Sequence, residues 1–326
     1  MSGLINAHDH LEFNLFPRLG NGPYADAGEW ARDIYHPDRS PVREHLRVPK
    51  PVRLWWGALK NLLSGVTTVS HHNPYEPAVF GPDFPVRVVR RFAWAHSLEF
   101  EPNIPLRFRS APKSPFLIHA GEGTDATSRA ELAQLDALRV LTPRTAVIHG
   151  VAFQEAELAL MRRRKAALIW CPTSNLQMLG RTVSRAILNS DLPIALATDS
   201  AVSAPIDLRD ELKVARRYLP AARLREMVTT IPSKILRVKH NDWIAVETKG
   251  DPFFTGHVSL VVVRNQIRLI SPTLARQLPS VRDFQPLTLE ERPTVLVAAD
   301  VKALTRAAKR HLGSDLYLAG KRVHPC

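Results

Sequence analysis

This sequence has few cysteines, and it has neither a long apolar run nor a leader-like N-terminus. Its 326 residues include only two cysteines, Cys171 and Cys326, which excludes a disulfide-rich secreted domain. No apolar run approaches the roughly 20 residues that a membrane-spanning helix requires. The N-terminus carries no basic region followed by a long apolar stretch. We therefore expect a cytoplasmic protein with no membrane partner.

Positive charge, in contrast, is abundant. The formal net charge is +13 at pH 7, which is compatible with binding a polyanion such as a nucleic acid. The basic residues are spread along the chain, however, and the densest run, Arg162 to Lys165, stands at the end of an expected helix. Cations are favoured at helix C-termini and are usually solvated there. We therefore do not expect a nucleic-acid partner.

Apolar strands alternate with amphipathic helices through much of the chain, which indicates a parallel sheet covered by helices. The first strand is expected to begin near Leu4, and a helix over 53–64 precedes a second strand over 66–69. Further along, we expect strands over 116–119, 146–149, 167–171 and 193–198, and helices over 129–140, 154–164, 183–189 and 206–218. This cadence is typical of repeated βα units.

Polar residues recur just after these strands, and this placement favours a closed barrel. In a (β/α)8 barrel of the TIM type, the working residues stand at the carboxyl ends of the strands. An open dinucleotide-binding sheet would instead carry a glycine-rich turn after the first strand, and none is present. Only 49 residues separate Val69 from His119, which is short for two full βα units. We expect the barrel to be distorted or shortened around its third and fourth units.

Two stretches interrupt this regular pattern. We expect a long proline-bearing loop over 16–51. The interval before His119 is harder to interpret, with a strand expected over 86–95 and another within 98–108.

The pattern changes near residue 241, where short strands and turns replace the βα units. Strands are expected over 243–246, 258–263, 266–270, 294–298 and 316–318, with a helix over 301–312. We therefore predict a barrel domain over 1–240 and a small β-rich C-terminal module over 241–326.

Two histidines separated by one residue, His8 and His10, end the first strand. Alternate side chains of a strand point the same way, so both imidazoles can contact one metal ion. An isolated pair of this kind is a weak signal. Here it is joined by His119, His149 and Asp199 at other strand ends, which together form a donor set suited to zinc, iron or manganese.

The chain resembles the metal-dependent amidohydrolase superfamily, in its deaminase and chlorohydrolase branch, which includes the cytosine, guanine and adenosine deaminases. The resemblance covers residues 1 to about 240. The matching segments are Gly3-Leu4-Ile5-Asn6-Ala7-His8-Asp9-His10-Leu11, Leu63-Ser64-Gly65-Val66-Thr67-Thr68-Val69, His119-Ala120-Gly121-Glu122, Cys171-Pro172-Thr173-Ser174-Asn175, Ala197-Thr198-Asp199-Ser200 and the helix Met227 to Leu236.

This resemblance implies a metal-dependent hydrolase acting on a carbon–nitrogen bond, most simply by deaminating a small nitrogen heterocycle. It implies one divalent metal, zinc before iron or manganese, held by His8, His10, His119 and Asp199. Asp199 would take a proton from a water, Glu122 would shuttle protons, and His149 would stabilise developing charge. Residues 70–118 offer no convincing bridging lysine for a second metal, since Lys113 lies immediately before the His119 strand.

The resemblance also leaves alternatives open. Family members usually carry a strand-forming stretch before the first barrel strand, so we expect only a partial β-sandwich here. Hydrolysis of a cyclic or acyclic amide, a degenerate enzyme and a non-enzymatic basic binding protein are the competing functions, and a homodimer stays open.

Several other residues carry narrower expectations. His71 and His72 either line the pocket or stand in an exposed loop. Ser174 and Asn175 are expected on the pocket floor. Three further expectations are structural: Trp55 and Trp56 pack a helix, Cys171 is a buried apolar residue, and His96 has no site role.

Overall fold

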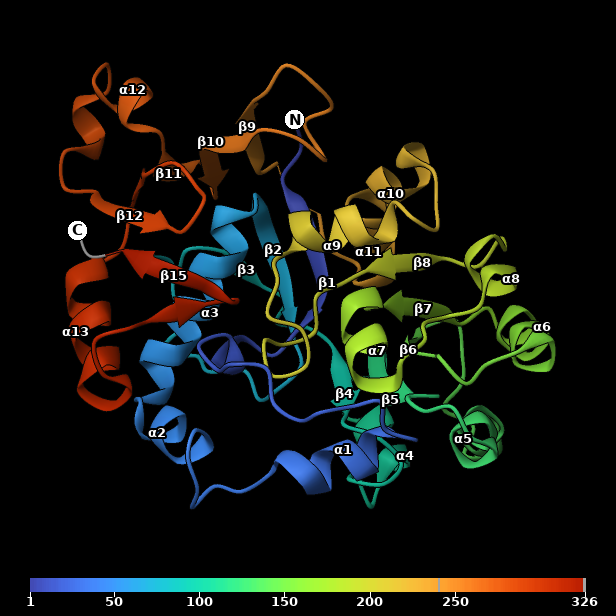
Figure 1. Ribbon diagram of the computed structural model, residues 1–326. Helices are drawn as coiled ribbons and strands as arrows, with labels where there is room; N and C mark the ends of the chain where they lie inside the picture. Colours follow the sequence, from blue (N-terminus) through green and yellow to red (C-terminus); the bar gives the residue numbers. More distant parts are fainter. Residues whose placement is uncertain (240, 325–326) are drawn as a thin grey trace.

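Figure 1 shows the computed structural model of the chain, which describes residues 1–239 and 241–324. Parallel strands alternate with helices over the first 235 residues. The parallel strands are β1 (Leu4–Asp9), β2 (Val66–His71), β3 (Arg87–Val88), β4 (Ala93–Ala95), β5 (Phe116–Ala120), β6 (Thr145–His149), β7 (Ala167–Trp170) and β8 (Ile194–Leu196). They are predominantly apolar and buried, as expected of strands covered on both faces.

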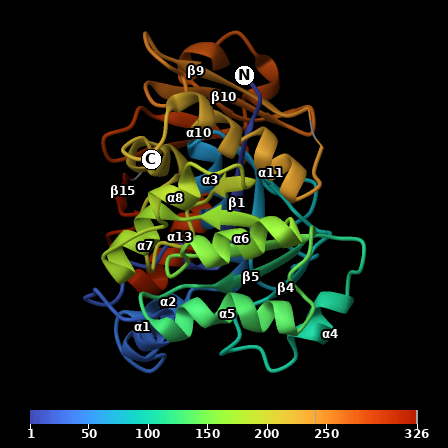
Figure 2. The same ribbon diagram turned by 90° about the vertical axis from the view of Figure 1, so that its right-hand side faces the viewer.

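Helices follow most of these strands and cover the outside of the sheets, as Figure 2 shows for α5 and α6. The helices of this region are η1 (Leu11–Phe13), α1 (Ala27–Ile34), α2 (Val42–Arg47), α3 (Lys50–Leu63), α4 (Ile104–Arg109), α5 (Ala126–Ala137), α6 (Glu155–Arg164), α7 (Pro172–Leu179), α8 (Arg185–Leu188), α9 (Leu208–Ala215), α10 (Ala221–Met227) and α11 (Thr230–Ile235). The alternating α/β architecture predicted from the sequence is therefore confirmed.

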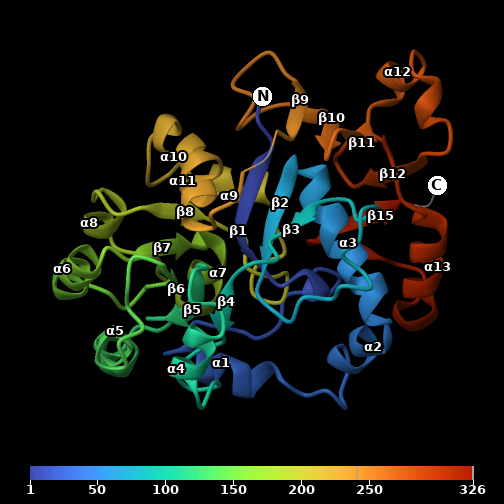
Figure 3. The same cartoon turned by 180° about the vertical axis from the view of Figure 1, so that it is seen from behind.

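The parallel strands form two sheets, of order β1-β2-β3 and β4-β5-β6-β7-β8, rather than one closed sheet. An isolated parallel bridge between Asp9 and Asp199 brings the end of β1 beside the residues that follow β8. Within the described residues no ladder joins β3 to β4, which Figure 3 shows from behind. The distortion predicted around the third and fourth units lies at this break.

The connection that precedes β3 is rich in proline. The stretch between β2 and β3 contains Pro74, Pro77, Pro82 and Pro85. Proline has no backbone N–H to donate to a ladder, and its fixed φ interrupts regular structure. This connection contains no strand, and the two strands that follow it are short: β3 has two residues and β4 has three.

An antiparallel sheet of order β14-β15-β12-β13-β11-β10-β9 follows the parallel region. Its strands are β9 (Trp243–Glu247), β10 (His257–Val263), β11 (Gln266–Ile270), β12 (Gln285–Leu289), β13 (Val295–Val297), β14 (Tyr317–Leu318) and β15 (Lys321–His324), with α12 (Pro272–Ala275), η2 (Pro279–Val281) and α13 (Val301–Leu312) between them. These agree with the predicted β-rich pattern. Ser2 forms an antiparallel bridge to Trp243, so this sheet lies at the amino end of β1.

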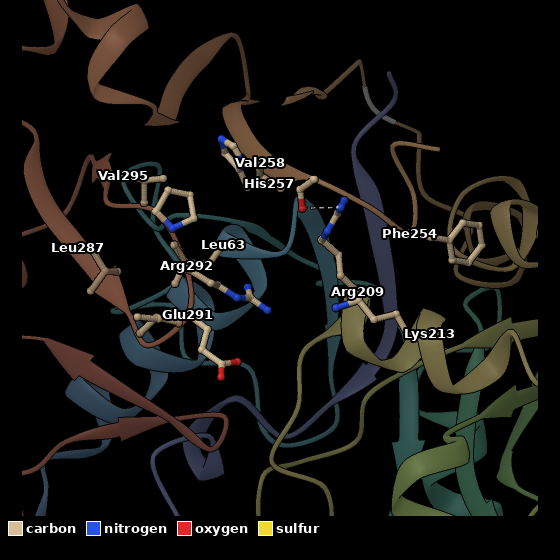
Figure 4. Close-up of a pocket in the computed structure, with 13 residues that line it drawn as sticks. Leu63, Arg209, Lys213, Phe254, His257, Val258, Leu287, Glu291, Arg292 and Val295 are labelled. Atoms are coloured by element: carbon tan, nitrogen blue, oxygen red, sulfur yellow. Dashed lines mark hydrogen bonds between the residues drawn. The ribbon is translucent and has the colours of Figure 1, made fainter. Parts of the chain in front are cut away.

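Figure 4 shows a cavity of about 250 Å³ between this sheet and α9. Its cationic side chains already have partners. Arg292 contacts Asp207 and Asp210, and Arg209 donates to the carbonyl oxygens of Pro252 at 2.8 Å and Gly256 at 3.2 Å. We interpret this polar cluster as the junction that fixes the start of α9 against the sheet.

Helix α3 packs unusually closely on η1, the short turn that follows the His8 and His10 strand. A Cβ atom at Gly57 would lie 2.1 Å from the carbonyl oxygen of Leu11. Only glycine permits this approach, because any side chain would overlap the backbone of η1. Trp56, the preceding residue, is fully buried, in agreement with its predicted packing role.

Two local predictions were wrong. The expected loop over 16–51 contains α1 and α2, because Asp26 caps α1 by accepting from the Glu29 N–H at 2.7 Å. Residues 98–108 contain the start of α4 rather than a strand, since the Asn103 side chain caps that helix. The segment after Cys171, for which no element was predicted, is α7, which begins with a proline at its first position.

No helix in the described part of the chain is both long enough and apolar enough to cross a membrane. Cys171 is fully buried, and burial raises the pKa of its thiol well above the usual value, which agrees with the predicted apolar role. Cys326 lies outside the described residues.

Candidate metal centre

Three imidazoles converge at the carboxyl ends of β1 and β5. His8 and His10 project from the same side of β1 and its end, and His119 projects from β5. The Nε2 atoms of His8 and His119 are 3.3 Å apart. One ring nitrogen from each histidine lies within 4.8 Å of the others. All three residues are buried.

Asp199 completes this cluster from the loop after β8. Its Oδ1 lies 3.4 Å from His8 Nε2 and 3.7 Å from His10 Nε2. Its other oxygen, Oδ2, accepts hydrogen bonds from the hydroxyls of Ser174 and Ser203, both at 2.7 Å. One oxygen is therefore fixed by hydroxyl groups while the other faces the imidazoles.

These donors fit a divalent metal ion. Zinc binds imidazole nitrogen at about 2.0–2.1 Å, so ligand atoms at tetrahedral angles lie about 3.3 Å apart. The separation of 3.3 Å between the Nε2 atoms of His8 and His119 meets that requirement. The separations from Asp199 Oδ1 to His8 and His10, 3.4 and 3.7 Å, are slightly longer. His119 Nδ1 lies 2.8 Å from the carbonyl oxygen of His96, to which it donates, so the Nε2 lone pair faces the cluster.

The charge states of the donors also suit a cation. Burial lowers the pKa of His8 to about 4 and lowers that of His119 well below its usual value, so both rings are neutral near pH 7. Burial alone would raise the pKa of Asp199. The hydrogen bond with His8 and the nearby histidines outweigh burial and hold that pKa well below its ordinary value. The site thus combines neutral imidazoles with an ionised carboxylate.

Glu122 and His149 form a second pair beside the cluster. His149 Nε2 lies 3.2 Å from Glu122 Oε1, and His149 Nδ1 lies 2.8 Å from the Asn175 side-chain oxygen. Burial, with the negative charges of Asp199 and Glu131 added, raises the pKa of Glu122 well above its usual value. The raised pKa favours the protonated form of Glu122, which can donate a proton.

The backbone at this edge is strained at two of the predicted site residues. His149 has φ of 74° and Asp199 has φ of 58°, in the left-handed region that side chains other than glycine seldom adopt. Such conformations persist when the surroundings fix them, and they concentrate at functional sites.

The structure brings the predicted site residues together. One cluster contains His8, His10, His119 and Asp199. Glu122 and His149 lie beside it, and each places a ligand atom within 4.8 Å of one from His119. Ser174 and Asn175 are buried and contact Asp199 and His149, in agreement with their expected place beneath the pocket.

Three further histidines surround the cluster without joining it. His71 and His72 are buried, which excludes the exposed-loop alternative. His72 Nε2 donates to the carbonyl oxygen of Ala95 at 3.0 Å, and the ring of His72 lies 4.6 Å from that of His119. The expectation that His96 has no site role needs revision, because His96 directly follows β4 and stacks on His119 at 4.8 Å.

A cavity of about 410 Å³ reaches this site from the side. His119 and Glu122 form its inner wall, and His96, Phe100 and Glu131 line it further out. It is large enough for a small heterocycle, and it offers access to Glu122.

The segment before α1 and the start of that helix lie across the strand ends and cover the metal cluster. Leu19 donates from its backbone to Val202 at 2.9 Å, Tyr24 to Met178 at 2.8 Å and Ala27 to Glu122 at 2.9 Å. These acceptors belong to the loops and helix that follow β8, β7 and β5. The segment that we expected to be a loop is thus tied to three strand ends.

Sequence reasoning missed several residues that support the site. Ser203 anchors Asp199, and Glu131 accepts the Gly121 N–H at 2.7 Å within the His119–Glu122 turn. Asp9 could have been found, because strand alternation places it on the face opposite His8 and His10, where a buried carboxylate needs a partner. Lys60 is such a partner, at 2.8 Å.

Comparisons with known proteins agree with this geometry. The chain matches no protein-family model. It is 36% identical over 69 residues to 5-methylthioadenosine/S-adenosylhomocysteine deaminases from two strains of Nitratidesulfovibrio vulgaris. That match spans 21% of this chain and only 16% of the curated relatives' length.

Similarity to solved structures is far more extensive. A zinc-bound adenosine deaminase from Xanthomonas campestris aligns over 96% of this chain and 84% of its own, with a TM-score of 0.69 and 18% identity. A mutant atrazine chlorohydrolase from Arthrobacter aurescens with zinc and atraton aligns over 96% and 88%, with a TM-score of 0.71 and 16% identity. Aminofutalosine deaminase from Helicobacter pylori with methylthio-coformycin aligns over 82% and 86%, with a TM-score of 0.57 and 15% identity.

The chain therefore shares the fold of these adenosine deaminase, atrazine chlorohydrolase and aminofutalosine deaminase structures.

Proposed function

We propose that this protein is a metal-dependent hydrolase that acts on a carbon–nitrogen bond, most simply by hydrolytic deamination of a nitrogen heterocycle. The observation that carries the proposal is the placement of Glu122 within ligand distance of His119 and His149, beside the cluster of His8, His10, His119 and Asp199. The names of the similar proteins support it, since they include two zinc-bound enzymes and deaminases of purine nucleosides.

The proposed metal ligands are His8, His10, His119 and Asp199. A divalent ion held there, zinc before iron or manganese, would supply a Lewis acid and lower the pKa of a water. Asp199 Oδ1 faces the imidazoles and is the oxygen available to accept a proton, because Ser174 and Ser203 occupy Oδ2.

Glu122 would act as the proton shuttle. Its raised pKa keeps a proton on the carboxyl group, which it can give to a ring nitrogen of the substrate. It would then relay to the departing amine the proton that Asp199 takes from water. His149 donates from Nδ1 to Asn175, which leaves Nε2 facing Glu122 and the reacting groups. His149 would therefore orient Glu122 and stabilise charge. Overall, water replaces the amine and ammonia leaves.

Hydrolysis of an amide is a second candidate, because another group of possible ligands is present. His119, Glu122 and His149 place one ligand atom each within 4.8 Å of one another. A second cation held there would occupy Glu122 and favour amide hydrolysis. The number of metal ions per chain distinguishes the two candidates: one supports deamination, and two support the amide reaction.

The experiment that tests the proposal is a screen of the zinc-reconstituted protein. Aminated purines and pyrimidines, 5-methylthioadenosine and chlorinated triazines would be supplied, with ammonia and chloride release measured. Ammonia release from at least one substrate, lost in Glu122→Gln, supports the proposal. Protein that contains no stoichiometric metal would instead support the non-enzymatic alternative, and metal-bound protein inactive on every compound would support the degenerate one.

Several broader predictions belong to the same proposal. We propose that the two parallel sheets together constitute a distorted TIM-type barrel over 1–240, and that 241–326 forms a separate module. A cytoplasmic location and a homodimer also stay predictions.

A further inference from the structure

A buried ion pair lies directly behind the candidate metal cluster. Lys60 Nζ is 2.8 Å from Asp9 Oδ2, and the two side chains are 2% and 0% exposed. Asp9 stands between His8 and His10 in the sequence, so its side chain occupies the opposite face of the same strand. Lys60 comes from α3, which packs on η1.

The Asp9 carboxylate is held in place by several donors besides Lys60. Asn14 donates to Oδ1 at 2.8 Å, and Asn61 donates to Oδ2 at 2.8 Å. Asn6 also donates to Oδ2, at 3.2 Å. A buried carboxylate with this many partners has one defined orientation, which fixes the strand that carries His8 and His10.

The same network reaches the fourth proposed ligand. Lys60 donates to Thr198 Oγ1 at 3.1 Å, and Asn6 donates to that oxygen at 2.8 Å. The Asn6 side-chain oxygen in turn accepts the Thr198 N–H at 3.2 Å. Thr198 directly precedes Asp199. One polar network therefore links the end of β1 to the residue before Asp199.

Stability alone is a poor explanation for this arrangement. Desolvating two charges commonly outweighs their mutual attraction, and well-packed apolar replacements are often as stable. Its location offers a better one, because groups behind metal ligands orient those ligands. We propose that the Lys60–Asp9 pair is a positioning device that sets the spacing of His8, His10 and Asp199 for metal binding. This inference rests on the proposed metal site.

The test compares zinc affinity with folding. Lys60→Met leaves the Asp9 charge buried without its partner, so it can impair folding as well as binding. The double variant Asp9→Asn with Lys60→Met removes both charges and keeps similar volumes. Zinc affinity would be measured by chelator competition, and thermal unfolding of the metal-free protein would be followed in parallel. Lys213→Met, which removes an exposed lysine on α9, is the matched control.

We expect the double variant to unfold at nearly the wild-type temperature while it binds zinc about 10- to 100-fold more weakly, the range typical of groups behind metal ligands. Excess zinc should restore its turnover. Unchanged zinc affinity in the double variant would overturn the inference. A loss of zinc affinity would also overturn it if the metal-free variant lost folding stability to the same extent. If the wild-type protein itself binds no stoichiometric zinc, the proposed function fails first, which separates the two outcomes.

Discussion

The two parts of the parallel region differ sharply in regularity. β5 to β8 form a continuous ladder, and β1 meets the residues after β8 through a bridge at Asp199. β2 to β4 are interrupted between β3 and β4. Every proposed ligand and catalytic residue comes from β1 or from the regular part. The irregular part supplies histidines too, His71, His72 and His96, yet none belongs to a group with ligand spacing.

The comparison teaches that histidine at a strand end is not sufficient for a metal ligand. His119 uses Nδ1 for a backbone carbonyl and presents Nε2 to the cluster. His72 uses Nε2 for the Ala95 carbonyl, so its outer nitrogen is already engaged. The nitrogen that each ring turns toward the cluster, rather than the position of the residue at a strand end, therefore distinguishes these two histidines.

The largest effect should come from removing a ligand in the regular part. His119→Ala should abolish metal retention and turnover together, because it deletes a neutral imidazole from the centre of the cluster. His72→Ala, in the irregular part, should keep the metal. Metal content after dialysis would be measured by mass spectrometry. Retention in His119→Ala, or loss in His72→Ala, would reverse the distinction drawn above.

Glu122→Gln should separate chemistry from binding within the regular part. The amide cannot shuttle a proton, so turnover should fall by about 10²- to 10⁴-fold. Zinc content should be unchanged, because Glu122 is not among the four proposed ligands. An unaltered kcat in this variant would show that the proton-shuttle assignment is wrong.

Stability should depend on pH through Glu211, on α9. Burial raises the pKa of Glu211 to about 8, although hydrogen bonds from Thr173 oppose the shift. The folded protein then holds a proton that the unfolded chain releases above its usual pKa of 4.5. The contribution of Glu211 to the free energy of unfolding is therefore fully present below pH 4.5. It decreases as the pH rises toward 8, by about 1.4 kcal/mol per pH unit at most.

Glu211→Gln provides the control for that prediction. The neutral amide has no proton to release, so denaturant unfolding measured between pH 5 and pH 8 should lose this slope. A slope equal to that of the wild-type protein would assign the pH dependence to other groups.

The smallest effect should come from His96→Ala, in the irregular part. His96 supports His119 through its backbone carbonyl, which alanine keeps. Zinc content should be unchanged, and turnover should fall by less than the ~10²-fold typical of an acid–base group. Loss of zinc would mean that stacking on His119, and not the carbonyl, orients that ligand.

Periodicity and motifs predicted most of the regular part. Apolar strands and amphipathic helices identified β5 to β8 and α5, α6 and α9, because each is a continuous pattern with a single period. The site residues followed from strand-end positions and from the family motifs. The antiparallel strands β9 to β11 were visible for the same reason, with β-branched runs between turns.

What the sequence did not reveal depends on contacts between distant residues. α1 and α4 are short and are capped by Asp26 and Asn103, whose capping bonds give only a weak signal in a polar segment. A distortion was expected around the third and fourth units, but the spacing of residues along the chain does not predict which strands pair there. The contact of Lys60 with Asp9 joins residues 51 positions apart, and no local pattern predicts it.

Gly57 sets a limit on how this molecule can change. The absent side chain lets α3 rest against the carbonyl oxygen of Leu11, one residue beyond His10. Random mutagenesis aimed at new substrates should therefore find position 57 nearly invariant, although it contacts no substrate. Variation that alters specificity should instead accumulate around the cavity that His119 and Glu122 line. There, Phe100 and its neighbours can be exchanged without moving the proposed metal ligands.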